Sequence, residues 1–231
     1  MKILAVDTSS FPASAAIAED NVILGEYVIR NKKKHSQNLM AMVERLFDDL
    51  DMDISEIDMF AVTVGPGSFT GLRIGISTVR AFAQAAGKPV VGINTLEALA
   101  YNFAGSDAIV IPMLDARRDE VFTAAYSFSG NEESELLAPT VMTIDEISGL
   151  FSDGNVIYTG DGMLKHRAEI TGDNIVFAPA HLSEVRAAAV AALAFAKSDR
   201  AVNYNMITPL YLRKSQAERE LENKKKGISD K

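Results

Sequence analysis

The sequence predicts an α/β fold of two lobes, each a mixed sheet with helices packed on it. Apolar strand-like runs open each half of the chain, and helical patterns with a further strand between them follow. A second set of strands and helices begins after Gly105-Ser106-Asp107, a turn-like stretch. Of the 231 residues, 48% are hydrophobic and 23% charged, enough for a sizeable core. We predict an N-terminal α/β lobe over 1–105, a C-terminal α/β lobe over 106–212 and a charged tail over 213–231.

The sequence of the N-terminal half predicts three consecutive strands. A helix, a strand, a second helix, a further strand and a third helix follow them. Asp20-Asn21 is a favourable turn pair between the second and third strands. Gly87, with a proline two residues later, ends the second helix. Thr95 is the expected N-cap of the last helix. The expected strands are 2–10, 13–20, 22–30, 59–65 and 89–96, and the expected helices are 32–50, 71–87 and 95–104.

The C-terminal half repeats the order of strands first and helices later. Residues 108–128 predict two strands joined by a turn at Asp115–Asp119. A short helix over 143–151, a strand and turn over 155–162, and an alanine-rich helix over 183–198 with Ser183 as its N-cap follow. Beyond Tyr211 the chain is highly charged, so we expect a frayed helix or a disordered tail.

Charge and composition exclude several classes of protein. The 23 Lys and Arg residues against 31 Asp and Glu give a net charge of −8, so no overall field attracts nucleic acid, and we expect tRNA contact only through another protein. The absence of cysteine rules out disulfides, thiolate metal sites and a cysteine nucleophile. No stretch approaches the ~20 apolar residues that span a bilayer. We expect a cytoplasmic protein that does not enter membranes.

The segment VTVGPGSFTGLRIG, residues 62–75, joins a strand to a helix through a glycine-rich turn of the kind that often cradles phosphate. A P-loop needs a wider spacing than that of Gly67 and Gly71, and Leu72 replaces its lysine. A dinucleotide fingerprint needs a third glycine where Thr70 stands. We therefore interpret the glycines sterically: they shape a tight turn and let the helix lie close to a neighbouring segment.

Two predicted helices, over 32–50 and 71–87, are more apolar than one packing face requires. This excess is typical of helices that also pack against another subunit, but packing of the two helices against each other gives the same pattern. On the first interpretation, Val79→Asp should prevent docking and leave the monomer folded. The candidate partner-binding residues are Leu39, Met42, Val43, Leu46, Arg73, Ile76, Val79, Arg80 and Ala83.

The sequence contains no complete metal-site or nucleophile motif. The acidic run over 48–58 lacks the glycine and the terminal glutamate of an EF-hand. The spacing of His35, His166 and His181 does not form a metal-binding helix face, and no serine elbow is present. We therefore expect neither a catalytic residue nor a metal site.

Acidic turns follow the first strand of each half, where the two-lobed ATPases related to actin, hexokinase and heat-shock ATPases hold phosphate and Mg²⁺. The first turn carries Asp7, Thr8 and Ser9, with Ser9 in place of a glycine. The second carries Asp115 and Arg117, and Arg117 stands where a glycine would let the backbone approach phosphate. The order of strands and helices, together with the positions of the two acidic turns, predicts this fold, which is also called ASKHA or ribonuclease H-like. We interpret the two turns as degraded phosphate turns. We expect no cofactor, leaving open a nucleotide at a subunit boundary.

Six segments closely resemble the bacterial TsaB (YeaZ) family: ILAVDTSS, HSQNLM, VTVGPGSFTGLRIG, GINTLEALA, DARRDEVF and PLYLRKS. The resemblance covers residues 1–217 and implies the same two-lobed fold. It implies a non-catalytic paralogue of the transferase TsaD, required for threonylcarbamoyl-adenosine next to the anticodon of tRNAs that read codons starting with A. It also implies that the two N-lobe helices dock on TsaD, or on a second copy as a homodimer when TsaD is absent, and that the ATPase TsaE is recruited. TsaD binds metal through paired histidines, and only His35 has a counterpart here.

Other function classes compete with the scaffold interpretation. An independent ATP-dependent enzyme of the same fold is disfavoured by Ser9 and Arg117, and a glycoprotease-type peptidase by the missing nucleophile, base and metal set. A direct tRNA binder requires a basic stripe, for which the one candidate is Lys32-Lys33-Lys34 with the lysines of the tail.

Overall fold

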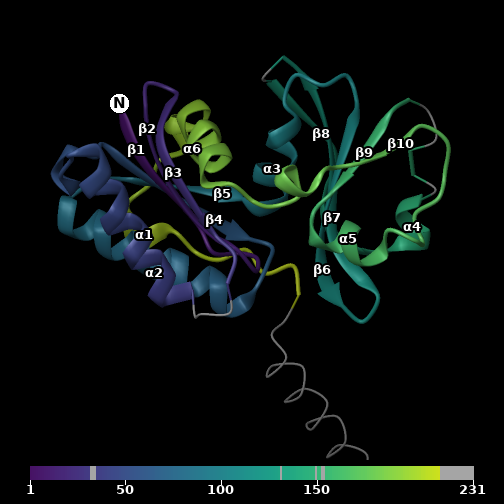
Figure 1. The fold of residues 1–231 in the computed structure, drawn as a ribbon, viewed down its shortest axis with the longest axis horizontal. Coiled ribbons are helices and arrows are strands. Elements are labelled where there is room, and N and C mark those ends of the chain that lie inside the picture. Colours follow the sequence, from purple (N-terminus) through teal and green to yellow (C-terminus); the bar gives the residue numbers. More distant parts are fainter. Residues whose placement is uncertain (32–34, 131, 149, 152–153, 214–231) are drawn as a thin grey trace, which may run out of the picture.

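The computed structural model describes residues 1–31, 35–130, 132–148, 150–151 and 154–213, which form two lobes side by side (Figure 1). Each lobe holds a five-stranded mixed sheet, with the strand orders β3-β2-β1-β4-β5 and β10-β9-β6-β7-β8. In the first sheet β1 pairs antiparallel with β2 and parallel with β4, and in the second β6 pairs antiparallel with β7 and parallel with β9. The two sheets therefore share one topology, and the predicted repetition of strand order is confirmed.

The element bounds agree with most of the predicted segments. The strands are β1 (Lys2–Asp7), β2 (Ala13–Glu19), β3 (Val22–Ile29), β4 (Met59–Gly65), β5 (Val90–Asn94), β6 (Ile109–Arg117), β7 (Glu120–Ser129), β8 (Glu132–Thr143), β9 (Val156–Thr159) and β10 (Ile175–Phe177). The helices are α1 (His35–Leu50), α2 (Phe69–Ala86), α3 (Thr95–Ala100), α4 (Ile144–Ser148), α5 (Asp161–His166) and α6 (Ala187–Ala196). Of the predicted tail over 213–231, the structure describes Arg213, whereas residues 214–231 and the lysines at 32–34 lie outside the described residues.

Several local expectations need correction. Strands β8 and β10 were not predicted, and the residues expected in a turn at 161–162 begin α5. Asn94, rather than Thr95, caps α3, because its side-chain oxygen accepts the N–H of Leu96 at 2.9 Å. The predicted left-handed glycine at the end of α2 is confirmed, since Gly87 has φ 66°.

Helix α6 is fixed to the first lobe, although the predicted division assigns its residues to the second. The helix begins at Ala187, so Ser183 is not its N-cap. The N–H groups of Ala187 and Ala188 instead donate to Ser14 Oγ of β2 and Glu26 Oε1 of β3, both at 3.0 Å. The helix packs on β1 and β2. The division of the chain near residue 105 itself stays a prediction.

The strands β1, β2 and β4 of the first sheet are buried on both faces, because their side chains alternate between two cores. In β1, Ile3 and Ala5 join the core beneath α6, whereas Leu4 and Val6 join the core beneath α1 and α2. Figure 1 shows α1 and α2 on one side of this sheet and α6 on the other. The core beneath α6 continues through α3 into β6 and β7, so one hydrophobic core joins the two lobes. In the described part of the chain, no helix is long and apolar enough to cross a membrane.

A partly buried ion cluster reinforces the junction between the lobes. Lys197, just after α6, donates to Glu97 of α3 and to Glu133 of β8, the latter at 2.5 Å. Burial raises the pKa of Glu97 to about 7, because a carboxylate loses hydration inside the protein. The cluster ties a helix of the first lobe to a strand of the second.

Candidate functional site

The turn after β1 is buried and is stabilised by hydrogen bonds to one of its own side chains. Asp7, Thr8 and Ser9 are at most 1% exposed. Asp7 Oδ1 accepts hydrogen bonds from the backbone N–H of Ser9 at 3.1 Å, from Ser9 Oγ at 2.6 Å and from Thr63 Oγ1 of β4 at 2.6 Å. This carboxylate oxygen therefore orders the turn, and the serine that replaces glycine supplies two of its donors.

The glycine-rich segment over 65–75 packs directly on this turn. The N–H of Ser68 donates to Ser9 O at 2.6 Å, and Thr8 Oγ1 donates to Gly71 O at 2.8 Å. A Cβ at Gly71 would lie 2.0 Å from Thr8 O, and one at Gly67 would lie 2.5 Å from Ser9 O. The steric interpretation of the glycines is confirmed, because they let the start of α2 close over the turn.

The turn after β6 has the opposite character. Arg117, Arg118 and Asp119 are exposed, and all three have positive φ, at 64°, 57° and 58°. Arg117 thus keeps a backbone conformation that favours glycine, with a long side chain attached. Burial alone would raise the pKa of Asp115, but hydrogen bonds from Lys165 Nζ at 3.0 Å and from the N–H of Arg117 at 2.9 Å outweigh it and lower that pKa.

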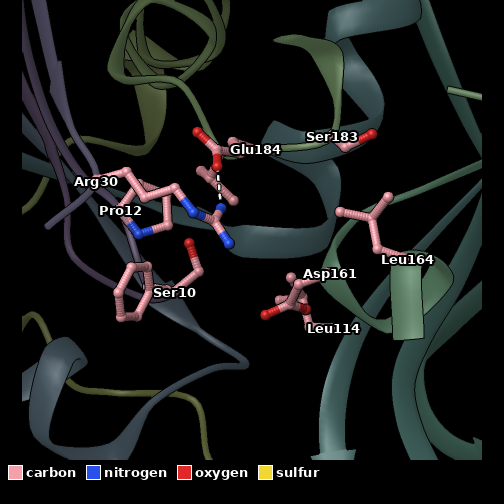
Figure 2. A pocket seen from close by; sticks show the side chains of 10 residues that line it. Ser10, Pro12, Arg30, Leu114, Asp161, Leu164, Ser183 and Glu184 are labelled. Atoms are coloured by element: carbon pink, nitrogen blue, oxygen red, sulfur yellow. Dashed lines mark hydrogen bonds and ion pairs between the residues drawn. The ribbon is translucent and has the colours of Figure 1, made fainter. Parts of the chain in front are cut away.

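Side chains from both lobes line the narrow space between them (Figure 2). Arg30, which follows β3, pairs with Glu184 and lies 5.1 Å from the ring centre of Phe11. Across the cavity, Asp161 of α5 faces the guanidinium group of Arg30. Burial raises the pKa of the Asp161 carboxyl. The cavity that remains measures about 10 Å³, the volume of a single water molecule.

Most of the predicted partner-binding side chains are inside the monomer. The seven apolar ones are at most 4% exposed: Leu39, Met42, Val43, Leu46, Ile76, Val79 and Ala83. They pack with the first sheet in the core beneath α1 and α2, so they cannot form an exposed docking face. Internal packing accounts for the excess of apolar residues. Val79→Asp would bury an unpaired charge and unfold the monomer, so the expectation that it leaves the monomer folded is wrong.

The two predicted partner-binding arginines contact a segment of the chain that follows α6, residues 205–213, of which we call 207–213 the strap. Arg80 donates to the carbonyl oxygens of Asn205 and Ile207, and Arg73 Nε donates to Tyr211 Oη at 3.1 Å. The N–H of Leu210 donates to Val64 O at 2.7 Å. The sequence analysis missed this return of the chain to α2, because the strap belongs to no helix or strand and carries no periodic pattern.

An open groove of about 500 Å³ runs along the outward face of α2. It is lined by Phe69, Thr70, Arg73, Ile74, Ser77 and Thr78. Tyr211 of the strap stacks on Phe69 at one end, with 4.4 Å between ring centres. The surface of α2 therefore combines an aromatic pair, an arginine, three hydroxyl groups and one aliphatic side chain.

Within the part of the chain that the structure describes, no group of His, Cys, Asp or Glu side chains is arranged to hold a metal ion. His166 is buried and its Nδ1 lies 2.8 Å from Glu169 Oε1, whereas the side chain of His35 lies outside the described residues. Four of the segments that resemble the TsaB family are joined in series. The glycine-rich segment contacts both the β1 turn and the strap, and the strap contacts the β6–β7 hairpin.

Two sheets of one topology, with equivalent turns after β1 and β6, define an ASKHA-type α/β protein. The ethanolamine utilization protein EutJ of Carboxydothermus hydrogenoformans shares this fold, with a TM-score of 0.53 at 11% identity over 83% of this chain and 89% of EutJ.

The family model described as TsaD, tRNA N6-adenosine threonylcarbamoyltransferase, matches residues 22–221. The tRNA threonylcarbamoyladenosine biosynthesis protein TsaB of Bacillus subtilis is 31% identical over 223 residues, which cover 94% of this chain and 96% of that protein. A solved structure from Pseudomonas aeruginosa, described as an uncharacterized protein with similarity to the peptidase YeaZ, has a TM-score of 0.80 at 27% identity and covers 92% of this chain and 99% of its own. The chain belongs to the TsaB (YeaZ) family.

Proposed function

We propose that this chain is a non-catalytic subunit in the formation of threonylcarbamoyladenosine, next to the anticodon of tRNAs that read codons starting with A. It binds the transferase TsaD, supports recruitment of the ATPase TsaE, and contacts tRNA only through TsaD, in the cytoplasm. Membership of the TsaB family supports the biosynthetic role, because curated relatives from Bacillus subtilis and Escherichia coli are named for it.

The closed space between the lobes is the observation that carries the non-catalytic part of the proposal. A nucleotide requires a pocket of a few hundred Å³, whereas the cavity beside Arg30 and Asp161 measures about 10 Å³. The shared core and the Lys197 cluster resist any opening of the lobes. The turn after β1 is covered by the chain itself, so the approach to a phosphate is blocked on the first-lobe side as well.

The outward faces of α1 and α2 are the proposed docking surface for TsaD. Met40 of α1 is 50% exposed, and the α2 groove adds apolar and hydroxyl side chains beside Arg73. A mixed surface of this kind is typical of non-obligate interfaces, in which aromatic residues, Met and Arg are enriched. The same face is available to a second copy of the chain when TsaD is absent, which accounts for the expected homodimer.

Mixing the chain with TsaD and measuring the mass of the complex tests the proposal. Ser77→Arg places a bulky charged side chain in the groove, and we expect it to weaken the complex by about tenfold or more, which corresponds to ~1.4 kcal/mol. The matched control is Thr171→Arg, on an exposed loop before β10, which should bind as the unmodified chain does. Both positions are exposed, so neither substitution should disturb the fold.

The outcomes separate the parts of the proposal. If the unmodified chain forms no complex with TsaD, the scaffold function is wrong. If Ser77→Arg and Thr171→Arg bind equally well, the docking surface lies elsewhere. If the chain alone hydrolyses ATP at a rate on the order of 1 s⁻¹, it is an independent enzyme of the same fold.

A further inference from the structure

The strap begins on the first lobe, where two backbone contacts fix its path. Leu210 donates its N–H to Val64 O at the end of β4. A Cβ on the neighbouring Gly65 would lie 2.4 Å from Leu210 O, so the strap passes as close to β4 as the backbone allows. Ile207, 6% exposed, anchors the start of the strap in the core beneath α1 and α2.

One residue further, Tyr211 is held by two residues of the α2 groove. Its ring stacks on Phe69, and its hydroxyl oxygen accepts a hydrogen bond from Arg73 Nε at 3.1 Å. The guanidinium carbon of Arg73 also lies 4.1 Å from the ring centre of Phe69. Because Phe69 and Arg73 line the groove, a molecule seated there meets the same side chains that hold Tyr211.

The strap reaches the second lobe two residues later. Arg213 Nη1 donates to Ala116 O at 2.9 Å, and the guanidinium group pairs with Glu120. Ala116 and Glu120 flank the exposed residues 117–119, whose φ angles are all positive. Arg213 therefore clamps the base of a hairpin tip whose backbone is strained.

We propose that the strap couples the α2 groove to the β6–β7 hairpin. Tyr211 and Arg213 are separated by at most ~7 Å of extended chain, so a displacement of the backbone at Tyr211 also displaces Arg213. A ligand or partner that displaces Tyr211 releases the clamp on the hairpin, and a hairpin held in another conformation alters the groove in return. This coupling is a property of the chain alone and does not depend on the docking of TsaD.

Hydrogen exchange of the full-length chain, followed by mass spectrometry on peptides covering 113–123, tests the coupling. Phe69→Ala removes the stack on Tyr211, more than 40 residues away in sequence from the hairpin, and we expect about tenfold faster exchange of the hairpin amides. Arg213→Ala should give an increase of the same size. The double variant should exchange no faster than Arg213→Ala, because the path is already broken. The control is Thr70→Ala, which also lines the groove but removes neither the stack on Tyr211 nor the Arg73 contact.

Two results would overturn the proposal. Unchanged hairpin exchange in Phe69→Ala would show that the strap transmits nothing. If Phe69→Ala raised the exchange rate of the hairpin amides by the same factor in the unmodified chain and in Arg213→Ala, the effect would not pass through Arg213. Should Phe69→Ala fail to fold, Tyr211→Phe keeps the stack and removes only the hydroxyl that binds Arg73. It should raise hairpin exchange by a smaller factor, and only when Arg213 is present.

Discussion

The turn after β1 and the turn after β6 occupy equivalent places in two sheets of the same topology, yet one is buried and the other exposed. Asp7 at the first turn accepts hydrogen bonds from Ser9 and Thr63 in the core. Asp115 at the second turn pairs with Lys165 at the surface, beside three residues with positive φ. The first turn is covered by the glycine-rich segment, whereas the second is clamped at its base by Arg213.

This difference separates a turn that is covered by backbone from a turn that stays at the surface. In the first lobe, the backbone of the glycine-rich segment covers the turn, and small residues are required so that the two segments can approach each other. In the second lobe, the backbone keeps the conformation that favours glycine, but Arg117 occupies it with a long side chain. We therefore predict that the two turns tolerate different residue types.

The largest effect is expected where the first turn is covered. Gly71→Ala would place a Cβ 2.0 Å from the carbonyl oxygen of Thr8, a contact that only backbone movement relieves. We expect the free energy of unfolding to fall by about 3 kcal/mol or more, measured by urea denaturation.

Gly25→Ala in β3 is the matched control. Its Cβ would meet side-chain methyl groups rather than backbone, the nearest belonging to Leu46 at 3.1 Å and Leu50 at 3.6 Å. We expect a change in the free energy of unfolding below about 1 kcal/mol. A mild effect of Gly71→Ala would show that the segment over 65–75 does not press on the first turn, and the contrast between the turns would lose its structural basis.

Replacing the two equivalent aspartates compares the turns directly. Asp7→Ala leaves the buried donors of Ser9 and Thr63 without their acceptor, so we expect a loss of about 3 kcal/mol in the free energy of unfolding. Asp115→Ala removes a pair with Lys165 in which the Asp115 side chain is 34% exposed, so the loss should stay below about 1 kcal/mol. Denaturation of both variants under the same conditions is the measurement. Equal losses would mean that the second turn is as tightly built as the first.

Much of the fold could be predicted because most of its strands have a recognisable local sequence pattern. Apolar runs ended by turn residues, as in β1 and β4, and the left-handed Gly87 are signals carried by neighbouring residues. Strand β8 lacks such a signal: it is rich in glutamate, lies largely at the surface and is ordered by pairing with β7. Helix α6 was predicted from its alanines, but its place on the first sheet depends on Ser14 and Glu26, far away in the sequence.

The candidate site was harder to predict than the fold. The glycine spacing correctly indicated a close approach, but not that its target is the carbonyl group of Thr8. Side chains such as Val79 were correctly identified as apolar, but periodicity cannot tell an internal neighbour from another chain. The contacts of Arg73 and Arg80 with the strap follow from tertiary structure alone, because no local pattern pairs α2 with residues more than 100 positions later.

The smallest effect, and the one of opposite sign, is expected at the second turn. Arg117 has φ 64°, so Arg117→Gly removes backbone strain, while the N–H that binds Asp115 Oδ1 is retained. Glycine also increases the conformational entropy of the unfolded chain, which offsets part of this stabilisation. We expect a net increase of about 0.5 kcal/mol in the free energy of unfolding. Arg45→Gly, in the interior of α1, removes an exposed arginine from a helix instead and should cost about 1 kcal/mol. Urea midpoints of the two variants should therefore move in opposite directions. A loss at Arg117 as large as that at Arg45 would mean that the long side chain stabilises the second turn, and the strain at the hairpin tip would not explain its character.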